Sequence, residues 1–275
     1  MKSLRLIFVI VAVFLVACAT TGPGGKKSLI IIPTSQEVAI GLGVVEELKQ
    51  TEKVLVDTVW QNYLNEVGQK IVKVCDRQDI EYHFTVIESE QVNAFALPGG
   101  FVYFYTGLLR EMENEAEMAM VLSHEISHIV ARHGVKRLQA AMGVSMAYEL
   151  VFGGEEAGKA LDLAINLGLT LIFSEYSRDN EREADFYGMH YLVKAGYDPH
   201  KGLGMFEKLA AMGGSEPNDV FEKLSSSHPA TQERIQNTKT QITQMGMLPS
   251  NLRVGTDKYT EMLRRLPPKA TSSAK

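Results

Sequence analysis

Cysteine is nearly absent from this sequence, which has two among its 275 residues. Two thiols cannot build the disulfide framework that stabilises many small secreted domains. An excess of basic side chains is also missing, because 28 lysines and arginines stand against 33 aspartates and glutamates, for a formal net charge of −5. A mildly acidic surface repels phosphate backbones, so nucleic acid is not an expected partner.

Apolar runs long enough to cross a bilayer are missing as well. Residues 6–16 and 163–174 are uncharged, but these stretches have 11 and 12 residues, whereas a spanning helix needs about 20. The second stretch is interpreted as a core helix, with contact to a membrane surface as the alternative. The chain is otherwise 45% hydrophobic and 22% charged, which is typical of a globular domain with a sizeable core.

The N-terminal residues are typical of an export signal. Lys2 and Arg5 precede the first apolar run, which ends in the residues Leu-Val-Ala-Cys at Cys18. This ending resembles the bacterial lipobox, which implies that residues 1–17 are removed and that Cys18 is acylated. An ordinary signal peptide with a chance cysteine is the alternative.

A lipid-anchored chain divides naturally into three further parts. Residues 18–33 are expected to form a flexible tether, residues 34–250 the folded domain, and residues 251–275 a loosely ordered tail. Ala19 follows the cysteine, where aspartate is associated with retention in the inner membrane. We therefore expect the protein in a bacterial cell envelope, facing the periplasm and anchored in the outer membrane.

Hydrophobic periodicity predicts an α+β fold that is mainly helical, with a small antiparallel β-sheet. Helices are expected over residues 34–50, 57–74, 114–133, 135–152, 157–174, 178–195, 199–212 and 229–245. Strands are expected over residues 82–87, 92–97 and 101–105, the last two joined by a Pro-Gly-Gly turn. Gly134 is expected to end the helix that begins after Asn114.

The sequence His124-Glu125-Ile126-Ser127-His128 is the strongest chemical signal. Residues four apart lie on one face of a helix, so both imidazoles can bind one metal ion, and Glu125 can reach a metal-bound water. A chance string, or two hydrogen-bonded core histidines, is the alternative. His133 is expected only to stabilise the end of this helix through its dipole.

A catalytic zinc usually takes three protein ligands, and a later helix offers the third. Glu181, Ala184, Asp185 and Gly188 form one stripe on that helix. The small residues permit close packing on the histidine helix, so that Glu181 can bind zinc while Asp185 accepts a hydrogen bond from a ligand histidine. A solvated acidic face is the alternative. Glu183 is expected to be a surface charge.

In this order the motifs resemble the zinc metallopeptidases typified by the heat-shock protease HtpX and the CAAX prenyl protease, metallopeptidase family 48. The resemblance covers about residues 35–245 and includes the segments 93–100 and 227–229. It implies a zincin-type fold with the small antiparallel β-sheet beside the HExxH helix, and one Zn²⁺ per chain. The implied residues are the zinc ligands His124, His128 and Glu181, the catalytic base Glu125 and the supporting carboxylate Asp185. Without spanning helices, the chain resembles the periplasmic lipoprotein branch.

Two further elements are candidates for substrate handling. His228, directly before Pro229, could donate a hydrogen bond to the tetrahedral oxyanion, occupy the open zinc position in a latent enzyme, or be an exposed loop histidine. Asn93, Ala94 and Phe95 are expected in an edge strand beside the zinc, where an extended peptide pairs with the backbone. An ordinary edge strand ended by proline is the alternative.

The sequence thus predicts a zinc metalloendopeptidase that cleaves unfolded or misassembled envelope polypeptides and is held to the bilayer through Cys18. The alternative function is that of a zinc-containing periplasmic chaperone or binding lipoprotein without proteolytic activity.

Overall fold

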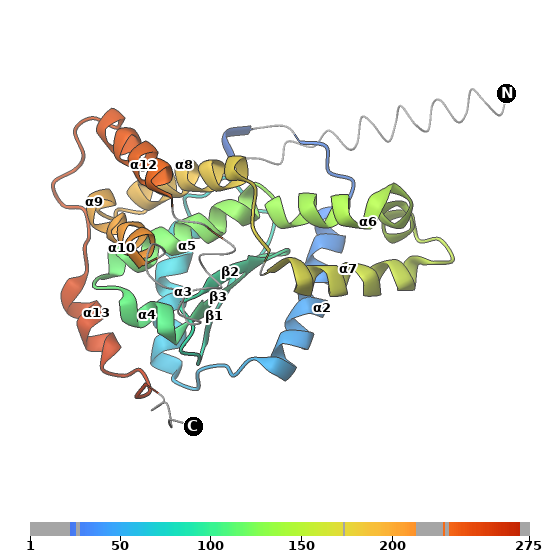
Figure 1. The fold of residues 1–275 in the computed structure, drawn as a ribbon, viewed down its shortest axis with the longest axis horizontal. Helices are drawn as coiled ribbons and strands as arrows, with labels where there is room; N and C mark the ends of the chain where they lie inside the picture. The colour runs from blue at the N-terminus through green and yellow to red at the C-terminus, as the bar shows by residue number, and fades with distance from the viewer. Residues whose placement is uncertain (1–22, 26–27, 173, 213–227, 229–230, 270–275) are drawn as a thin grey trace.

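The computed structural model describes residues 23–25, 28–172, 174–212, 228 and 231–269 (Figure 1). The elements in chain order are η1 (Pro23–Gly25), α2 (Thr34–Thr51), α3 (Thr58–Val72), β1 (His83–Ile87), β2 (Ala94–Leu97), β3 (Phe101–Tyr105), α4 (Thr106–Glu111), α5 (Glu115–Val130), α6 (His133–Phe152), α7 (Ala157–Ile172), α8 (Arg178–Lys194), α9 (Pro199–Gly202), α10 (Gly204–Met212), α12 (Gln232–Gln244) and α13 (Thr256–Leu263). The predicted signal sequence and Cys18 lie outside the described residues. The mainly helical α+β prediction is confirmed.

The three strands form a mixed sheet in the order β1-β3-β2. β2 and β3 are antiparallel, as expected, with Ala94 opposite Phe104. β1 and β3 are parallel, with His83 opposite Phe101, so the prediction of an entirely antiparallel sheet is wrong. The chain reverses direction twice between β1 and β3, and β3 then lies between the other two strands. β2 is therefore left at an edge of the sheet.

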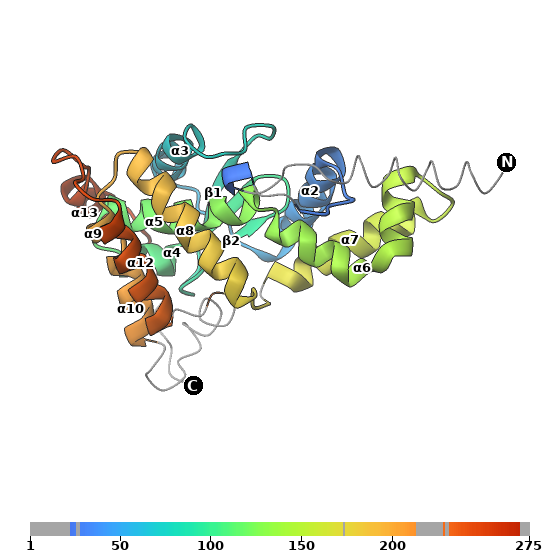
Figure 2. The same cartoon turned by 90° about the horizontal axis from the view of Figure 1, so that it is seen from above.

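Both faces of the sheet are buried under helices. On one face, Val86, Val102 and Phe104 belong to a core cluster with residues of α3, α5 and α8. On the other face, Phe95 and Tyr103 belong to a second cluster with residues of α2, α6 and α7. Successive strand residues point to opposite faces, so each strand supplies both cores. α5 therefore lies at the centre of the molecule, with α8 beside it (Figures 1 and 2).

α7 contains residues 163–172 of the uncharged stretch predicted as a core helix. Ala164, Gly168 and Ile172 are buried, and the helix packs against α2 and α6 (Figure 2). Within the described ranges, no helix is long and apolar enough to cross a membrane.

A buried ion-pair cluster joins α2 to the segment after α3, to the turn after β2 and to the end of α5. The Glu37 carboxylate accepts hydrogen bonds from Arg77 Nη1 and Nη2 at 2.9 and 2.8 Å and from the Gly99 amide at 3.2 Å. Arg132 Nε lies 2.8 Å from the same carboxylate. Breaking a buried pair of this kind leaves an uncompensated charge, so this cluster fixes the positions of all four segments.

The HExxH helix ends earlier than its sequence suggested. α5 stops at Val130, and Arg132 adopts the left-handed conformation with φ 53°. Its Nη2 donates a hydrogen bond to the Ile32 carbonyl oxygen at 2.6 Å, which helps to hold this unusual backbone. The prediction that Gly134 ends the helix is wrong, because the tertiary contacts of Arg132 place the break before His133.

The C-terminal segment also differs from expectation. Instead of a loosely ordered tail, residues 256–263 form α13, with Tyr259 and Met262 fully buried. The Tyr259 hydroxyl donates a hydrogen bond to the Leu109 carbonyl oxygen at 2.7 Å, and the Trp60 indole N–H donates one to the Met262 carbonyl oxygen at 2.9 Å. These long-range contacts hold α13 against the rest of the fold.

A second buried carboxylate ties this segment to the start of α5. Glu115 accepts hydrogen bonds from the hydroxyls of Tyr63 and Tyr197, both at 2.7 Å, and from Arg253 Nε and Nη2 at 2.5 and 2.7 Å. Burial alone would raise the pKa of Glu115, but these donors outweigh it and lower the pKa below the ordinary 4.5. The carboxylate therefore stabilises the fold in its charged form.

We expect Glu115→Gln to lower the free energy of unfolding at pH 7 by about 1–3 kcal/mol, since charge-assisted hydrogen bonds are lost while Arg253 stays half-exposed. The folded-state pKa is depressed, so this stabilisation is complete well above pH 4.5 and disappears as the pH falls through the lower folded-state pKa. Urea unfolding from pH 7 to pH 3 measures the difference, with the exposed Glu47→Gln in α2 as the control. A deficit that grows on acidification would contradict this account.

Candidate metal centre

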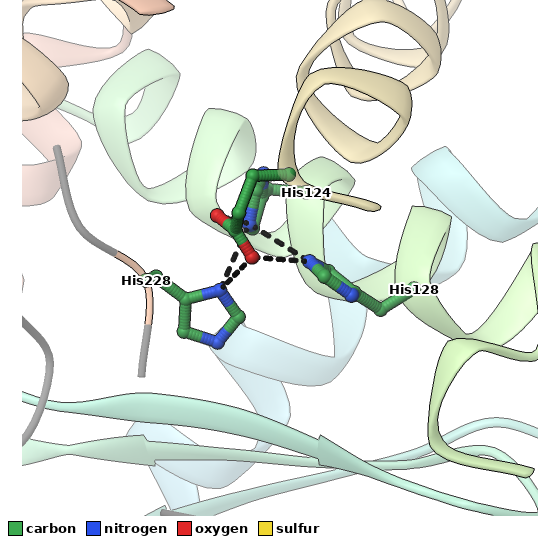
Figure 3. Close-up of side chains that lie close together, drawn as sticks. His124, His128 and His228 are labelled. Atoms are coloured by element: carbon green, nitrogen blue, oxygen red, sulfur yellow. Dashed lines mark hydrogen bonds and ion pairs between the residues drawn. The ribbon is translucent and has the colours of Figure 1, made fainter. Parts of the chain in front are cut away.

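α5 presents two histidines on one buried face. Its first turn is capped by Asn114, whose side chain accepts a hydrogen bond from the Glu117 amide at 3.0 Å. Every residue of α5 is buried. One turn apart, His124 and His128 bring their Nε2 atoms to 3.1 Å from each other (Figure 3). The spacing of the motif therefore produces the convergence that the sequence predicted.

α8 brings the predicted carboxylates to these rings. Ser177 caps the helix, and its stripe of Glu181, Ala184, Asp185 and Gly188 is buried. A methyl group at Gly188 would lie 3.1 Å from the His124 amide nitrogen, so glycine permits the close approach of α8 to α5. The alternative of a solvated acidic face is wrong.

Glu181 lies between the two histidine rings. Its Oε2 is 3.5 Å from His124 Nε2, and its Oε1 is 3.4 Å from His128 Nε2. His228 also joins the cluster, with its Nδ1 2.9 Å from Glu181 Oε1 and 3.3 Å from His124 Nε2 (Figure 3). The His228 side chain is only 6% exposed, so the interpretation of an exposed loop histidine is wrong.

The spacing of these atoms fits a metal ion. One ligand atom from each of His124, His128, Glu181 and His228 lies within 4.8 Å of the other three. Five of the nitrogen–nitrogen and nitrogen–oxygen separations in this cluster are 2.9–3.5 Å, close to the tetrahedron edge of about 3.3 Å that zinc bonds of 2.0–2.1 Å would give. Three imidazole nitrogens and a carboxylate oxygen are donors that a divalent transition metal accepts. The residues present therefore fit a resident cation.

Electrostatics in the cluster also favours a cation. Burial lowers the pKa of His124, but hydrogen bonds to Asp185 and Glu181 outweigh it and raise the pKa to about 9. Burial lowers the pKa of His128 well below 6.5. The Glu181 pKa lies well below its usual range because the neighbouring histidines, His228 foremost, outweigh the effect of burial. A metal ion would replace the proton held by His124.

Asp185 occupies the supporting position that the sequence assigned to it. Its Oδ1 lies 3.0 Å from His124 Nδ1. Arg234, in the first turn of α12, donates from Nε and Nη2 to the two Asp185 oxygens at 2.7 Å and pairs through Nη1 with Glu181 Oε2 at 2.7 Å. Burial would raise the Asp185 pKa, but Arg234 and His124 lower it. The carboxylate is thus charged and fixed from both sides.

Sequence reasoning missed Arg234. The signal available was an arginine six residues after His228, at the start of a predicted helix. A basic residue there would normally be exposed, whereas Arg234 is buried between two carboxylates. Only the packing of α12 on α8 reveals the difference.

His133 and Glu183 also have different positions from those expected. His133 is fully buried at the start of α6, with Nδ1 3.0 Å from His128 Nδ1 and Nε2 3.4 Å from Glu183 Oε2. The Glu183 side chain is 11% exposed. The helix-dipole role predicted for His133 and the surface position predicted for Glu183 are both wrong, because α5 breaks before His133 and turns its ring toward α8.

Glu125 lies beside the cluster with an available oxygen. The residue is 1% exposed, its Oε1 is 3.8 Å from His228 Nε2, and its Oε2 has no hydrogen-bond partner among the described residues. A small cavity of about 20 Å³ adjoins it. The residues lining this cavity are Val121, His124, Glu125, Phe206, Leu209, His228, Arg234 and Ile235.

The predicted substrate strand lies at the sheet edge next to α5. Asn93 directly precedes β2, and its buried side-chain amide has no hydrogen-bond partner in the part of the chain that the structure describes. Ala94 and Phe95 are buried, with the Phe95 ring stacked on Tyr103 at 5.0 Å. The side chains of Ala94 and Phe95 therefore serve the core, the backbone of β2 pairs with β3, and the Asn93 side chain is left for other contacts.

Comparisons with known proteins agree with these motifs. The model of peptidase family M48 matches residues 59–242. The beta-barrel assembly-enhancing protease of Yersinia pestis is 28% identical over 231 residues, covering 80% of this chain and 47% of that protein. The mitochondrial metalloendopeptidase OMA1 of Schizosaccharomyces pombe is 32% identical over 174 residues, covering 63% and 50%.

A third relative, the metalloprotease YcaL of Escherichia coli, is 30% identical over 162 residues, covering 58% of this chain and 62% of that protein. The chain spans about half the length of the curated relatives it matches. The family match covers most of the chain, including the HExxH helix, the Glu181 helix and His228. The resemblance stated from the motifs is therefore confirmed, and the chain belongs to peptidase family M48.

Proposed function

We propose that this chain is a zinc-dependent endopeptidase that hydrolyses peptide bonds in unfolded or misassembled bacterial envelope proteins. The observation that carries the proposal is the convergence of His124, His128 and Glu181 around one point, with Glu125 beside it. Membership of peptidase family M48 supports the reaction. The name of the Yersinia and Escherichia relatives, beta-barrel assembly-enhancing protease, supports an envelope substrate.

His124, His128 and Glu181 would hold one Zn²⁺ ion, which when bound lowers the pKa of a coordinated water and polarises the scissile carbonyl. Glu125 accepts the proton of the attacking water and passes it to the leaving amine. Its buried, unpartnered Oε2 suits that role. Asp185, held by Arg234, keeps His124 oriented with Nε2 toward the ligand cluster.

The edge strand supports binding of an extended substrate. A peptide paired with the backbone of β2 would lie beside α5. The unpartnered amide of Asn93 gives the strand one additional donor and acceptor, and a buried amide left unpaired costs about 1–3 kcal/mol that a substrate can recover. Pairing of this kind requires a locally unfolded substrate.

Replacing Glu125 with glutamine removes the proton acceptor and leaves the ligands in place. We expect Glu125→Gln to bind Zn²⁺ like the wild type and to cleave unfolded casein at least about 10²-fold more slowly. Chelation should abolish wild-type cleavage and added Zn²⁺ should restore it. The exposed Glu47→Gln serves as the control. Equal cleavage by Glu125→Gln would favour a contaminating protease, and no cleavage by any form would favour the chaperone function.

His228 supports a further part of the proposal. Its Nδ1 lies among the ligand atoms while its Nε2 faces Glu125, which suits a fourth ligand in a latent enzyme as well as a ring that later stabilises the oxyanion. We expect His228→Ala to retain Zn²⁺, since three ligands remain, and to change peptidase turnover about 10-fold or more. Faster turnover indicates release from latency, and slower turnover indicates loss of the oxyanion donor. Parallel loss of zinc and activity would make His228 a structural ligand.

We propose that acylated Cys18 anchors the chain in the outer membrane. The lipobox-like ending at Cys18 and the relatives named beta-barrel assembly-enhancing protease support this assignment. We expect Cys18→Ser to move the protein from the membrane fraction to the soluble fraction and to abolish incorporation of a clickable fatty acid. Cys75→Ser, which replaces a buried cysteine, is the matched control. Unchanged labelling of Cys18→Ser would contradict the anchor.

A further inference from the structure

His133 is a buried polar residue that the proposed mechanism does not use. Its ring is fully buried at the junction of α5 and α6, between His128 and Glu183. A buried imidazole without a function is normally a core residue whose nitrogens are satisfied. Here one of the groups that satisfy the His133 ring is His128, which faces the metal site. The position of His133 therefore concerns the metal site as well as the core.

The geometry fixes which nitrogen carries each proton when a metal is bound. His128 Nε2 faces the other ligand atoms, so the metal takes Nε2 and the His128 proton is on Nδ1. That N–H then donates to His133 Nδ1, 3.0 Å away. The remaining His133 proton is on Nε2, which points to the charged Glu183 oxygen at 3.4 Å. All the donors therefore point outward from the metal site.

Buried side chains surround this series of contacts. The Tyr176 ring lies 4.2 Å from the His128 ring and 6.1 Å from the His133 ring, centre to centre, and is only 8% exposed. On the other side, Arg132 starts α6 from its left-handed conformation and is held by Glu37. The ring of His133 is thus fixed by packing, and hydrogen bonds at low local dielectric are stronger than in water.

We propose that His133 is a positioning residue for the metal site, which together with Glu183 fixes the tautomer and orientation of His128. The arrangement parallels that of the other ligand histidine, whose Nδ1 faces Asp185 and, beyond it, Arg234. Metal-bound histidines commonly donate their outer N–H to a partner of this kind. The inference rests on the proposed function, since it requires His128 to hold a metal ion.

Three variants of the full-length chain test the proposal. His133→Phe keeps a ring but removes both nitrogens, His133→Asn keeps a carbonyl oxygen that can accept from His128, and Glu183→Gln removes the outer charge. We expect His133→Phe to weaken Zn²⁺ affinity by about 10–100-fold, measured by competition with a chromophoric chelator. His133→Asn should retain most of the affinity, and Glu183→Gln should have an intermediate effect.

Matched controls separate positioning from folding. His190→Asn replaces a half-buried histidine of α8 that bonds to Gln241, and Asp179→Asn removes an exposed charge from the same helix as Glu183. Both should bind Zn²⁺ like the wild type. The visible absorption of the Co²⁺-substituted protein gives a second measurement, because a weaker hydrogen bond at Nδ1 changes the donor strength of Nε2. We expect Glu183→Gln to shift these bands and Asp179→Asn to leave them unchanged.

Wild-type Zn²⁺ affinity in His133→Phe would overturn the proposal, as would equally weak binding by His133→Asn. If His133→Phe does not fold, the comparison of Glu183→Gln with Asp179→Asn decides, and identical affinities and Co²⁺ spectra would overturn it. No substrate enters these measurements. A protein that binds Zn²⁺ in the expected order but cuts no peptide would contradict the proposed function alone.

Discussion

The close packing of α8 on α5 is the contact on which the rest of the site depends. Glu181 can stand between two imidazoles only because Gly188 lets the α8 backbone approach the His124 backbone, where a methyl group would already be 3.1 Å from the amide nitrogen. The same approach buries Glu181 and Asp185. Buried carboxylates are costly without partners, so the contact between α5 and α8 requires the histidines and Arg234 as partners of Glu181 and Asp185. The residues that form the site therefore also stabilise the helix packing.

The two histidines of the candidate metal centre on α5 are held from outside by different chemistry. His124 faces a charged carboxylate that is itself paired with an arginine from α12. His128 faces a neutral ring from the first residue of α6. These contacts thus come from four separate segments of the chain, α5, α6, α8 and α12. The ion-paired carboxylates Glu37 and Glu115 fix the two ends of α5, which carries both histidines.

Membership of family M48 places this geometry among metallopeptidase sites. The strand order of the sheet decides which strand lies beside the site. β3 lies between the other strands and leaves β2 at the edge beside α5. Strand periodicity identified β3 at its observed bounds and the other two strands to within two residues, because alternation of apolar residues is local. It did not identify the parallel pairing of β1 with β3, because strand order depends on which strand fills the space between the others.

The sequence by itself determined whatever depends on spacing along one helix. The i, i+4 histidines and the stripe from Glu181 to Gly188 follow from helix geometry alone. Tertiary structure alone decided what joins distant segments: the burial of Arg234 between two carboxylates, the folding of residues 256–263 against Trp60, and the break at Arg132 that turns His133 toward His128. The physical reason is that a charged or polar side chain is buried only where partners from elsewhere in the chain compensate its lost hydration, and local sequence does not specify those partners.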